Sequence, residues 1–187
     1  RTPETVRQVR VEKGIEPKSS TRITFFGEVG PDELPKHRAR AVASILSDRL
    51  RQVLREDLGG TYGASVSFSG RDPLPGFQTM TVAFGSAPEN VDKMVKAALA
   101  EIEKLRGDGP ALADVQKDQE VERRELEVGL KRNPYWMASL QTVHMLGWDP
   151  RRIAKRAERI ELLTPETLRE TFRACFPADR YTVVSLF

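Results

Sequence analysis

The sequence predicts an α+β domain in which one mixed, largely antiparallel sheet has its helices packed on one face. The first observation behind this prediction is the segregation of strands and helices, in the order strand, long helix, two strands, a block of helices and a final strand. The second is that each expected helix has one apolar stripe, which suits one-sided packing. We expect residues 1–20 to be a linker or extended segment and residues 21–187 to be a single domain.

Composition places the chain among ordinary globular domains. Its 187 residues are enough for one sizeable core, and 39% of them are hydrophobic and 30% charged. The net charge is +3, but the 30 basic residues are interleaved with 27 acidic ones, so we expect no nucleic-acid partner. No run of about 18 apolar residues is present, so no membrane span is predicted.

Two further features concern the origin of the chain and its compartment. It begins at Arg1 rather than at Met, and we expect it to be a piece of a longer protein whose targeting segment lies upstream. The single cysteine, Cys175, excludes an internal disulfide and leaves the redox compartment open. Its place on an apolar helical stripe predicts a buried small side chain rather than a reactive thiol.

The first half of the domain has the pattern of a strand, a long helix and a hairpin. Polar and apolar residues alternate at residues 21–26, which predicts a strand. A helix is expected from about residue 35 to 58, and Gly59 ends it because a residue without Cβ takes the left-handed conformation readily. Alternation returns from Tyr62 onward and again at residues 78–85, which predicts two strands joined by a long connection.

The helical block begins after the hairpin. Residues 86–89 have the Ser-x-x-Glu form of a capping box, and the helix that follows keeps an apolar stripe until residues 107–110 end it. From residue 111 to about 132 the chain is so highly charged that we expect a mostly solvated helix, although a recognition surface is the alternative.

Three shorter helices and a strand complete the expected order. Asn133-Pro134, Asp149-Pro150 and Thr164-Pro165 each place a capping side chain directly before a proline, which predicts three helix starts. The apolar run from Tyr181 to Phe187 predicts the final strand.

The most informative segment is the corner between the long helix and the strand after it, residues 54–63. Arg55 lies off the apolar stripe in the last helical turn, where a cation complements the helix dipole. Tyr62 opens the strand, where an aromatic side chain is typical of a half-buried sheet position. From pattern alone these structural roles are the first interpretation, and a functional role is the alternative.

This corner and the helix before it resemble the signature of the C-terminal, non-zinc half-domain of the pitrilysin/insulinase-type zinc metallopeptidases, the inverzincins. The resemblance rests on the seven-residue step from Arg55 to Tyr62, on the glycines between them and on the Arg49-Leu50 pair. It covers nearly the whole chain from about Glu16. The segment Gly14 to Ser19 also resembles a bacterial periplasmic branch of the family, which favours the periplasm over the cytoplasm.

The family resemblance implies a processing-peptidase or pitrilysin-like half-domain that takes part in proteolysis as a hydrolase of peptide bonds. It implies that the hydroxyl of Tyr62 stabilises the oxyanion of the tetrahedral intermediate, and that Arg55 holds the substrate backbone or a neighbouring carbonyl. Substrates of the family are extended peptides, often paired along a sheet edge. The sequence leaves open which edge that is.

The sequence does not contain the ligand set of a catalytic zinc site. Such a site needs histidines at helical spacing with acidic partners, and this chain has only His37 and His144, neither in a zinc motif. We expect His37 to be solvated at the start of the long helix and His144 to be half-buried in an apolar helix. No cofactor or metal is therefore expected in this chain, and the resemblance places the zinc in a partner half.

The resemblance also implies the partners. They are an N-terminal zinc-bearing half-domain, on the same polypeptide or as a separate subunit, and a peptide or protein substrate; a homo-oligomer stays open. We expect the chain alone to be inactive and to complete the active site of a zinc-dependent metalloendopeptidase. The alternative is a non-catalytic recognition or structural subunit of the same superfamily.

Overall fold

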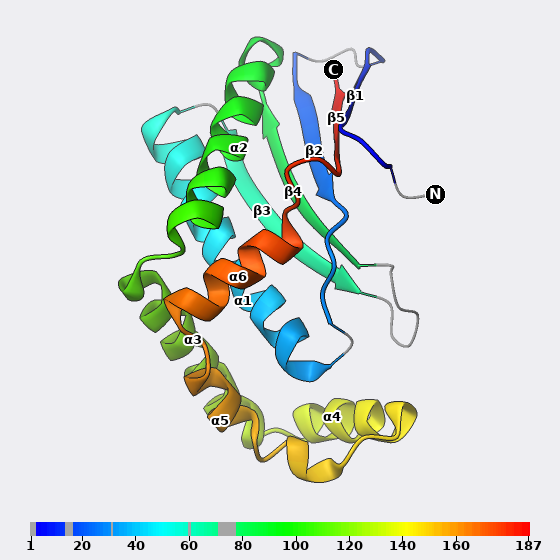
Figure 1. Cartoon of the computed structure of the whole chain (residues 1–187), viewed down its shortest axis with the longest axis vertical. Helices are drawn as coiled ribbons and strands as arrows, with labels where there is room; N and C mark the ends of the chain where they lie inside the picture. Colours follow the sequence, from blue (N-terminus) through cyan, green and yellow to red (C-terminus); the bar gives the residue numbers. More distant parts are fainter. Residues whose placement is uncertain (1–2, 14–16, 31, 60, 71–77) are drawn as a thin grey trace.

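The computed structural model describes residues 3–13, 17–30, 32–59, 61–70 and 78–187, apart from the side chains of residues 56, 57 and 62. In this part of the chain one mixed sheet of five strands is combined with helices (Figure 1), so the predicted α+β class is confirmed. The strands are β1 (Arg7–Val11), β2 (Ser19–Phe25), β3 (Thr61–Gly70), β4 (Gln78–Ser86) and β5 (Tyr181–Leu186). The α-helices are α1 (Glu33–Arg51), α2 (Val91–Asp108), α3 (Leu112–Leu130), α4 (Asn133–Leu146), α5 (Arg156–Glu161) and α6 (Pro165–Cys175).

The sheet has the strand order β1-β5-β2-β4-β3, and only the β1–β5 pair is parallel. Alternate side chains of the central strands point to the covered face, as in Ile23 and Phe25 of β2 and Met80 and Val82 of β4, all of which are buried. Strand β1 comes from the segment expected to be a linker or extended, and it forms one edge of the sheet. The other edge is β3.

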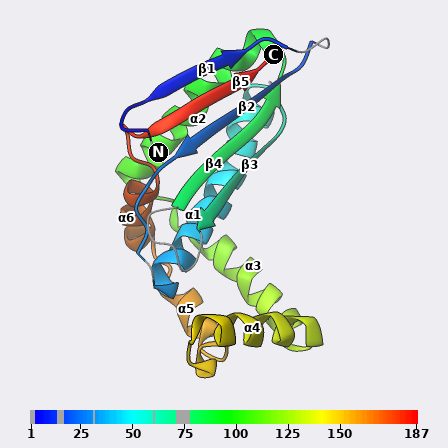
Figure 2. The ribbon, with the colours of Figure 1, turned by 90° about the vertical axis from the view of Figure 1, so that its right-hand side faces the viewer.

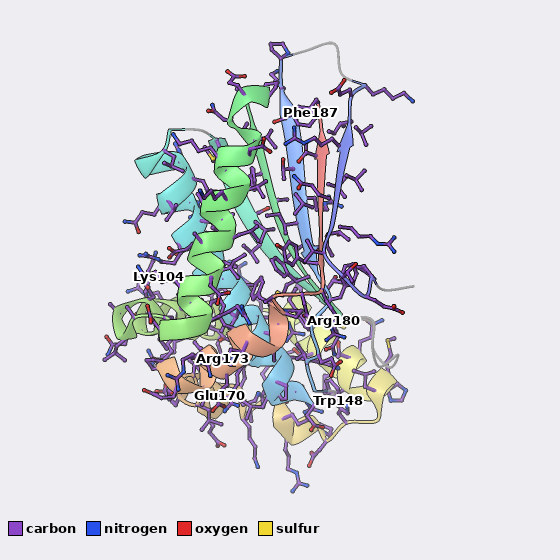
Figure 3. The ribbon with its side chains drawn as sticks, turned by 45° about the horizontal axis from the view of Figure 1, so that its top comes forward. Lys104, Trp148, Glu170, Arg173, Arg180 and Phe187 are labelled. Atoms are coloured by element: carbon purple, nitrogen blue, oxygen red, sulfur yellow. The ribbon has the colours of Figure 1, made fainter. Side chains whose placement is uncertain are left out.

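Helices α1, α2 and α6 lie on one face of the sheet, and the opposite face has no helix over it among the described residues (Figure 2). Their inner sides carry the core, which includes the fully buried side chains of Leu46, Met94 and Phe172. Their outer sides carry charged side chains such as Lys104 and Arg173 (Figure 3). This arrangement agrees with the single apolar stripe predicted for each helix.

The end of β2 approaches the end of α6 very closely at Gly27. A Cβ atom built on Gly27 would lie 2.3 Å from the carbonyl oxygen of Ala174, so only glycine fits there. The same carbonyl accepts a hydrogen bond from the N–H of Glu28 at 3.1 Å. This contact joins the first strand of the predicted domain to its last helix.

Helices α3, α4 and α5 lead away from the sheet, and we call residues 112–161 the helical arm (Figures 1 and 2). In α3 only Val115 and Leu126 are buried, and Leu112 and Leu130 are exposed, so the predicted mostly solvated helix is confirmed. None of the helices in the described ranges combines the length and the apolar character that crossing a bilayer requires.

Helices begin at the predicted positions, but the predicted capping side chains are confirmed in two places and wrong in two. Asp149 and Thr164 accept hydrogen bonds from the backbone N–H groups of Arg151 and Thr167, as caps do. Asn133 makes no side-chain cap, and Arg132 is the residue that precedes the helix. The capping box at residues 86–89 is also absent, because the hydroxyl of Ser86 lies 3.1 Å from that of Ser19 on the neighbouring strand.

Candidate functional site

The helix side of the predicted corner departs from α-helical geometry. At Gln52 the helix changes to a π-helix that continues to Asp57, and Arg55 lies inside it with an exposed side chain. The carbonyl of Arg55 accepts a hydrogen bond from the N–H of Gly59 at 3.1 Å, and Gly59 has the left-handed φ of 60° predicted for the stop. The π-helix was not predicted, because the apolar stripe continues through it.

The strand side of the corner is irregular as well. The pairing of β3 with β4 shifts between Thr61 and Ala64, so that Tyr62 and Gly63 together stand opposite Gly85 alone. Such a two-to-one arrangement is a β-bulge, which re-aims the side chains of the bulged residues. Tyr62 therefore lies at the bulge, while its side chain is outside the described residues.

Thr61 stabilises this bulge. Its hydroxyl accepts a hydrogen bond from the N–H of Gly63 at 3.2 Å and lies 2.9 Å from the carbonyl oxygen of Gly63 and close to that of Gly85. This role of Thr61 was not predicted from the sequence. The available signal was a hydroxyl residue directly after a glycine pair, which is typical of local side-chain-to-backbone hydrogen bonding.

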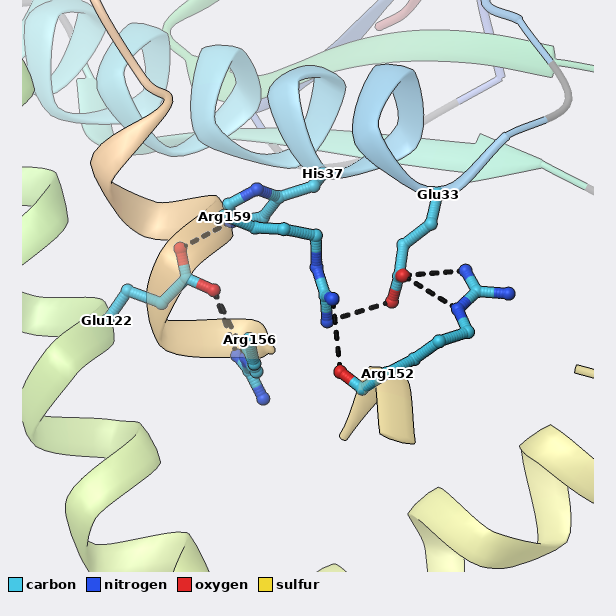
Figure 4. A network of polar contacts seen from close by, with 6 residues as sticks. All are labelled: Glu33, His37, Glu122, Arg152, Arg156 and Arg159. Carbon is cyan, nitrogen blue, oxygen red and sulfur yellow. Dashed lines mark hydrogen bonds and ion pairs between the residues drawn. The ribbon is translucent and has the colours of Figure 1, made fainter. Parts of the chain in front are cut away.

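A second group of functional residue types lies where the arm meets the body. His37 was expected to be solvated, and this prediction is wrong: it is 7% exposed, and its Nε2 lies 2.7 Å from Oε2 of Glu122. Glu122 also accepts a hydrogen bond from Arg156 at 3.1 Å (Figure 4). The burial arises because α3 packs across the beginning of α1.

Glu33 forms the second centre of this contact. Its carboxylate lies 2.6 Å from Arg152 and 3.0 Å from Arg159, and Arg159 also donates to the carbonyl of Arg152 (Figure 4). The guanidinium of Arg152 lies 3.6 Å from the centre of the Trp148 ring. We call Glu33, His37, Glu122, Arg152, Arg156 and Arg159 the arm network.

The arm network borders a cavity of about 600 Å³ between α1, α3, α4 and α5. Burial tends to raise the pKa of Glu122, but hydrogen bonds from His37 and Arg156 outweigh it and hold that pKa below the usual range. Burial raises the pKa of Asp118, on the cavity wall, against a hydrogen bond with Ser44. The carboxylates and guanidiniums of the network satisfy one another, so the contact has the character of a dock for the arm.

The two remaining candidate residues, Cys175 and His144, differ in how exposed their side chains are. Cys175 is buried as predicted, and burial raises the pKa of its thiol to about 12, which makes it unreactive. His144 was expected to be half-buried, and this prediction is wrong because it lies on the exposed side of α4. Within the described ranges no three side chains of His, Cys, Asp and Glu converge in a way that would hold a metal ion.

The chain is similar in sequence to known proteins. Residues 2–121 match the family profile described as the peptidase M16 inactive domain. A zinc protease PQQL-like protein of Arabidopsis thaliana is 34% identical over 103 residues, which are 51% of this chain and 11% of that protein.

Solved structures show the same fold at low identity. The periplasmic protease PqqL of Escherichia coli has a TM-score of 0.82 and 18% identity over 99% of this chain and 21% of its own. The peptidase M16 inactive domain of Pseudomonas fluorescens has a TM-score of 0.81 and 17% identity over 100% of this chain and 44% of its own. This chain thus spans about a fifth of PqqL and less than half of the other structure.

The description of the matched family profile agrees with the expectation that the zinc is carried by the other half. In the family the zinc belongs to the other half, and the matched half is the inactive one. Because the profile covers more than half of the chain, from residue 2 to residue 121, the chain belongs to the peptidase M16 inactive-domain family.

Proposed function

We propose that this chain is the substrate-binding, active-site-completing half of a zinc-dependent metalloendopeptidase, with the zinc carried by an N-terminal half. The observation that carries the proposal is the coincidence of two backbone irregularities with the two predicted site residues. Arg55 lies in a π-helix and Tyr62 at a β-bulge, and both kinds of irregularity are frequent at functional sites. Membership of the family supports peptide-bond hydrolysis as the reaction, and the irregular corner supports Arg55 and Tyr62 as the residues that take part in it.

The proposed roles fit the chemistry of the two side chains. An exposed guanidinium such as that of Arg55 donates several hydrogen bonds and suits a substrate carbonyl or backbone. The phenol of Tyr62 donates one hydrogen bond to the oxyanion that develops on the scissile carbonyl. A single donor of this kind contributes on the order of 2.7 to 4 kcal/mol to transition-state stabilisation.

The strand order supports a particular edge for the substrate. Strand β3 pairs only with β4 among the described residues, so its outer side offers unpaired backbone groups next to the corner. An extended peptide added there would lie beside the bulge at Tyr62, as in recognition by strand addition. Ser65, Ser67 and Ser69 of β3 are exposed on the face without helices, and their small side chains leave room for the substrate.

The relatives support the setting of this activity. PqqL is described as a periplasmic protease, and a related structure is a mutant of the ferredoxin protease FusC in complex with Arabidopsis ferredoxin. We therefore propose the bacterial periplasm as the compartment and a protein or long peptide as the substrate class. Because the chain covers only a fifth of either relative, these assignments belong to the assembled protein.

The proposal is tested by combining this chain with the zinc-bearing half and measuring cleavage of a long peptide. Tyr62→Phe removes one hydroxyl and should lower kcat by roughly a hundredfold to a thousandfold, with zinc content and thermal stability unchanged. Tyr135→Phe, a matched change in the arm, should leave kcat unaltered.

Arg55→Ala is the second variant in this test. It should raise KM and lower kcat/KM, whereas Arg51→Ala, one turn earlier on the same exposed helix surface, should change neither. Unchanged turnover in Tyr62→Phe would remove Tyr62 from the mechanism. Binding of peptide without any cleavage by the combined wild-type halves would favour a recognition subunit instead.

A further inference from the structure

Helix α4 exposes an apolar surface that the fold does not cover. Its side chains of Trp136, Met137, Leu140 and Met145 are 39%, 73%, 48% and 73% exposed. At helical spacing Met137 and Leu140 lie on the side of α4 opposite the cavity-lining residues Tyr135 and Thr142, and Trp136 and Met145 lie at the two borders of that side. We call Trp136, Met137, Leu140 and Met145 the α4 surface.

The absence of charge on this helix is the second observation. Residues 133–146 contain no Asp, Glu, Lys or Arg, although 30% of the whole chain is charged and α3 directly before it carries charges in every turn. An exposed helix normally has charged residues on its outer side. Depletion of charge together with exposed Met and aromatic residues is typical of the centre of a protein interface.

The third observation is that α4 has little attachment to its own domain. Val143 is the one residue of α4 that is buried, and it is just 8% exposed. The inner side of α4 faces the cavity of about 600 Å³ rather than the apolar core. The indole N–H of Trp136 donates a hydrogen bond to the carbonyl of Leu130 at 2.9 Å, but packing within the described part of the domain leaves Met137, Leu140 and Met145 largely exposed.

Composition narrows the choice of partner. Nucleic acids and acidic membrane surfaces are bound through Lys and Arg, which α4 lacks. The partner class that fits α4 is therefore a protein surface with an apolar groove.

We infer that the α4 surface docks onto the zinc-bearing half of the assembled peptidase. The structural match to PqqL covers 99% of this chain and 21% of that one, so there the same domain, α4 included, is part of a much longer polypeptide. A domain on the same polypeptide is present at an effective concentration of the order of mM, which favours it over a second copy of the chain. The inference rests on the two-half assembly of the proposed function.

The test is the association of this chain with the zinc-bearing half, measured by calorimetry and by hydrogen exchange of the α4 amides. The variant Met137→Glu/Leu140→Glu should weaken association at least about tenfold and leave the α4 amides exchanging rapidly. Leu112→Glu is the matched control, because Leu112 is 59% exposed on the charged helix α3, and it should bind like the wild type. Circular dichroism should show both variants folded.

The possible results separate the two proposals. Wild-type affinity in the α4 variant would overturn the docking inference and leave the proposed function intact, provided that cleavage persists. Failure of the wild-type halves to associate would overturn both proposals. A dimer of this chain alone that the α4 variant converts to monomer would assign the α4 surface to a second copy and overturn the inference.

Discussion

The sheet with α1, α2 and α6 buries large apolar side chains, whereas the helical arm is joined to that body mainly through carboxylates, guanidiniums and one histidine. Leu168 and Phe172 of α6 are 0% exposed within the core. In the arm, Val115 belongs to that core cluster, whereas Leu126 and Ile160 are buried outside it. Where the arm meets the body, Glu33 of α1 and Glu122 of α3 each contact two basic side chains. Apolar burial thus stabilises the body, whereas paired charges provide most of the contact between the body and the arm.

This difference has consequences for how the two regions respond to their surroundings. Apolar burial depends on the area removed from water and hardly on pH. Paired charges depend on protonation, and their net contribution after desolvation is small unless one partner is lost. We therefore expect the body to determine overall stability and the arm to move or detach more readily when pH or partners change.

The largest expected effect is the loss in free energy of unfolding when a buried leucine is changed to alanine, and this loss should differ between the two regions. Leu168→Ala in the body should lower the free energy of unfolding by about 3 to 5 kcal/mol, because it leaves a cavity in a rigid core. Leu126→Ala in α3, where the side chain is 6% exposed and lies outside the core cluster, should cost about 2 kcal/mol. Urea unfolding monitored by circular dichroism measures both, and equal losses would contradict the division into body and arm.

A smaller effect is expected in the arm network. Glu122→Gln should lower the free energy of unfolding at pH 7 by about 2 kcal/mol, because it weakens charge-assisted hydrogen bonds with His37 and Arg156. Since the folded pKa of Glu122 is lowered, its stabilisation is present above the ordinary carboxyl pKa of about 4.3 and is lost as pH falls through the folded value.

The difference between wild type and Glu122→Gln should therefore shrink when unfolding is measured at pH 3. Glu127→Gln is the matched control, since Glu127 pairs with Lys131 in full solvent, and it should give no measurable change at either pH. A penalty for Glu122→Gln that is the same at both pH values would show that its carboxylate charge contributes nothing to the dock.

The smallest effect has the opposite sign. Burial raises the folded pKa of Asp118, so its contribution to stability is favourable below the unfolded pKa and is lost as pH rises through the folded value. Asp118→Asn should therefore raise stability at pH 7 by less than about 1 kcal/mol and give no such gain at pH 3. Asp114→Asn should instead lower stability slightly, because it removes a carboxylate from the first turn of α3.

Much of the fold could be predicted because its signals are local. Alternation gave β2 and β4 within two residues of their ends, and the stop at Gly59 followed from its freedom to adopt positive φ. The caps at Asp149 and Thr164 involve residues two or three positions apart. The candidate site was located in the same way, since the step from Arg55 to Tyr62 lies within one corner.

The sequence by itself determined the α+β class, the one-sided helical layer and the position of the corner, because periodicity and turn residues act over a few positions. Tertiary structure decided the burial of His37, which depends on Glu122 at a distance of 85 residues along the chain. It also decided the bulge at Tyr62, which needs the partner strand β4, and the exposure of α4, which depends on where α3 places it. Contacts between distant segments fix these features, and no local pattern contains them.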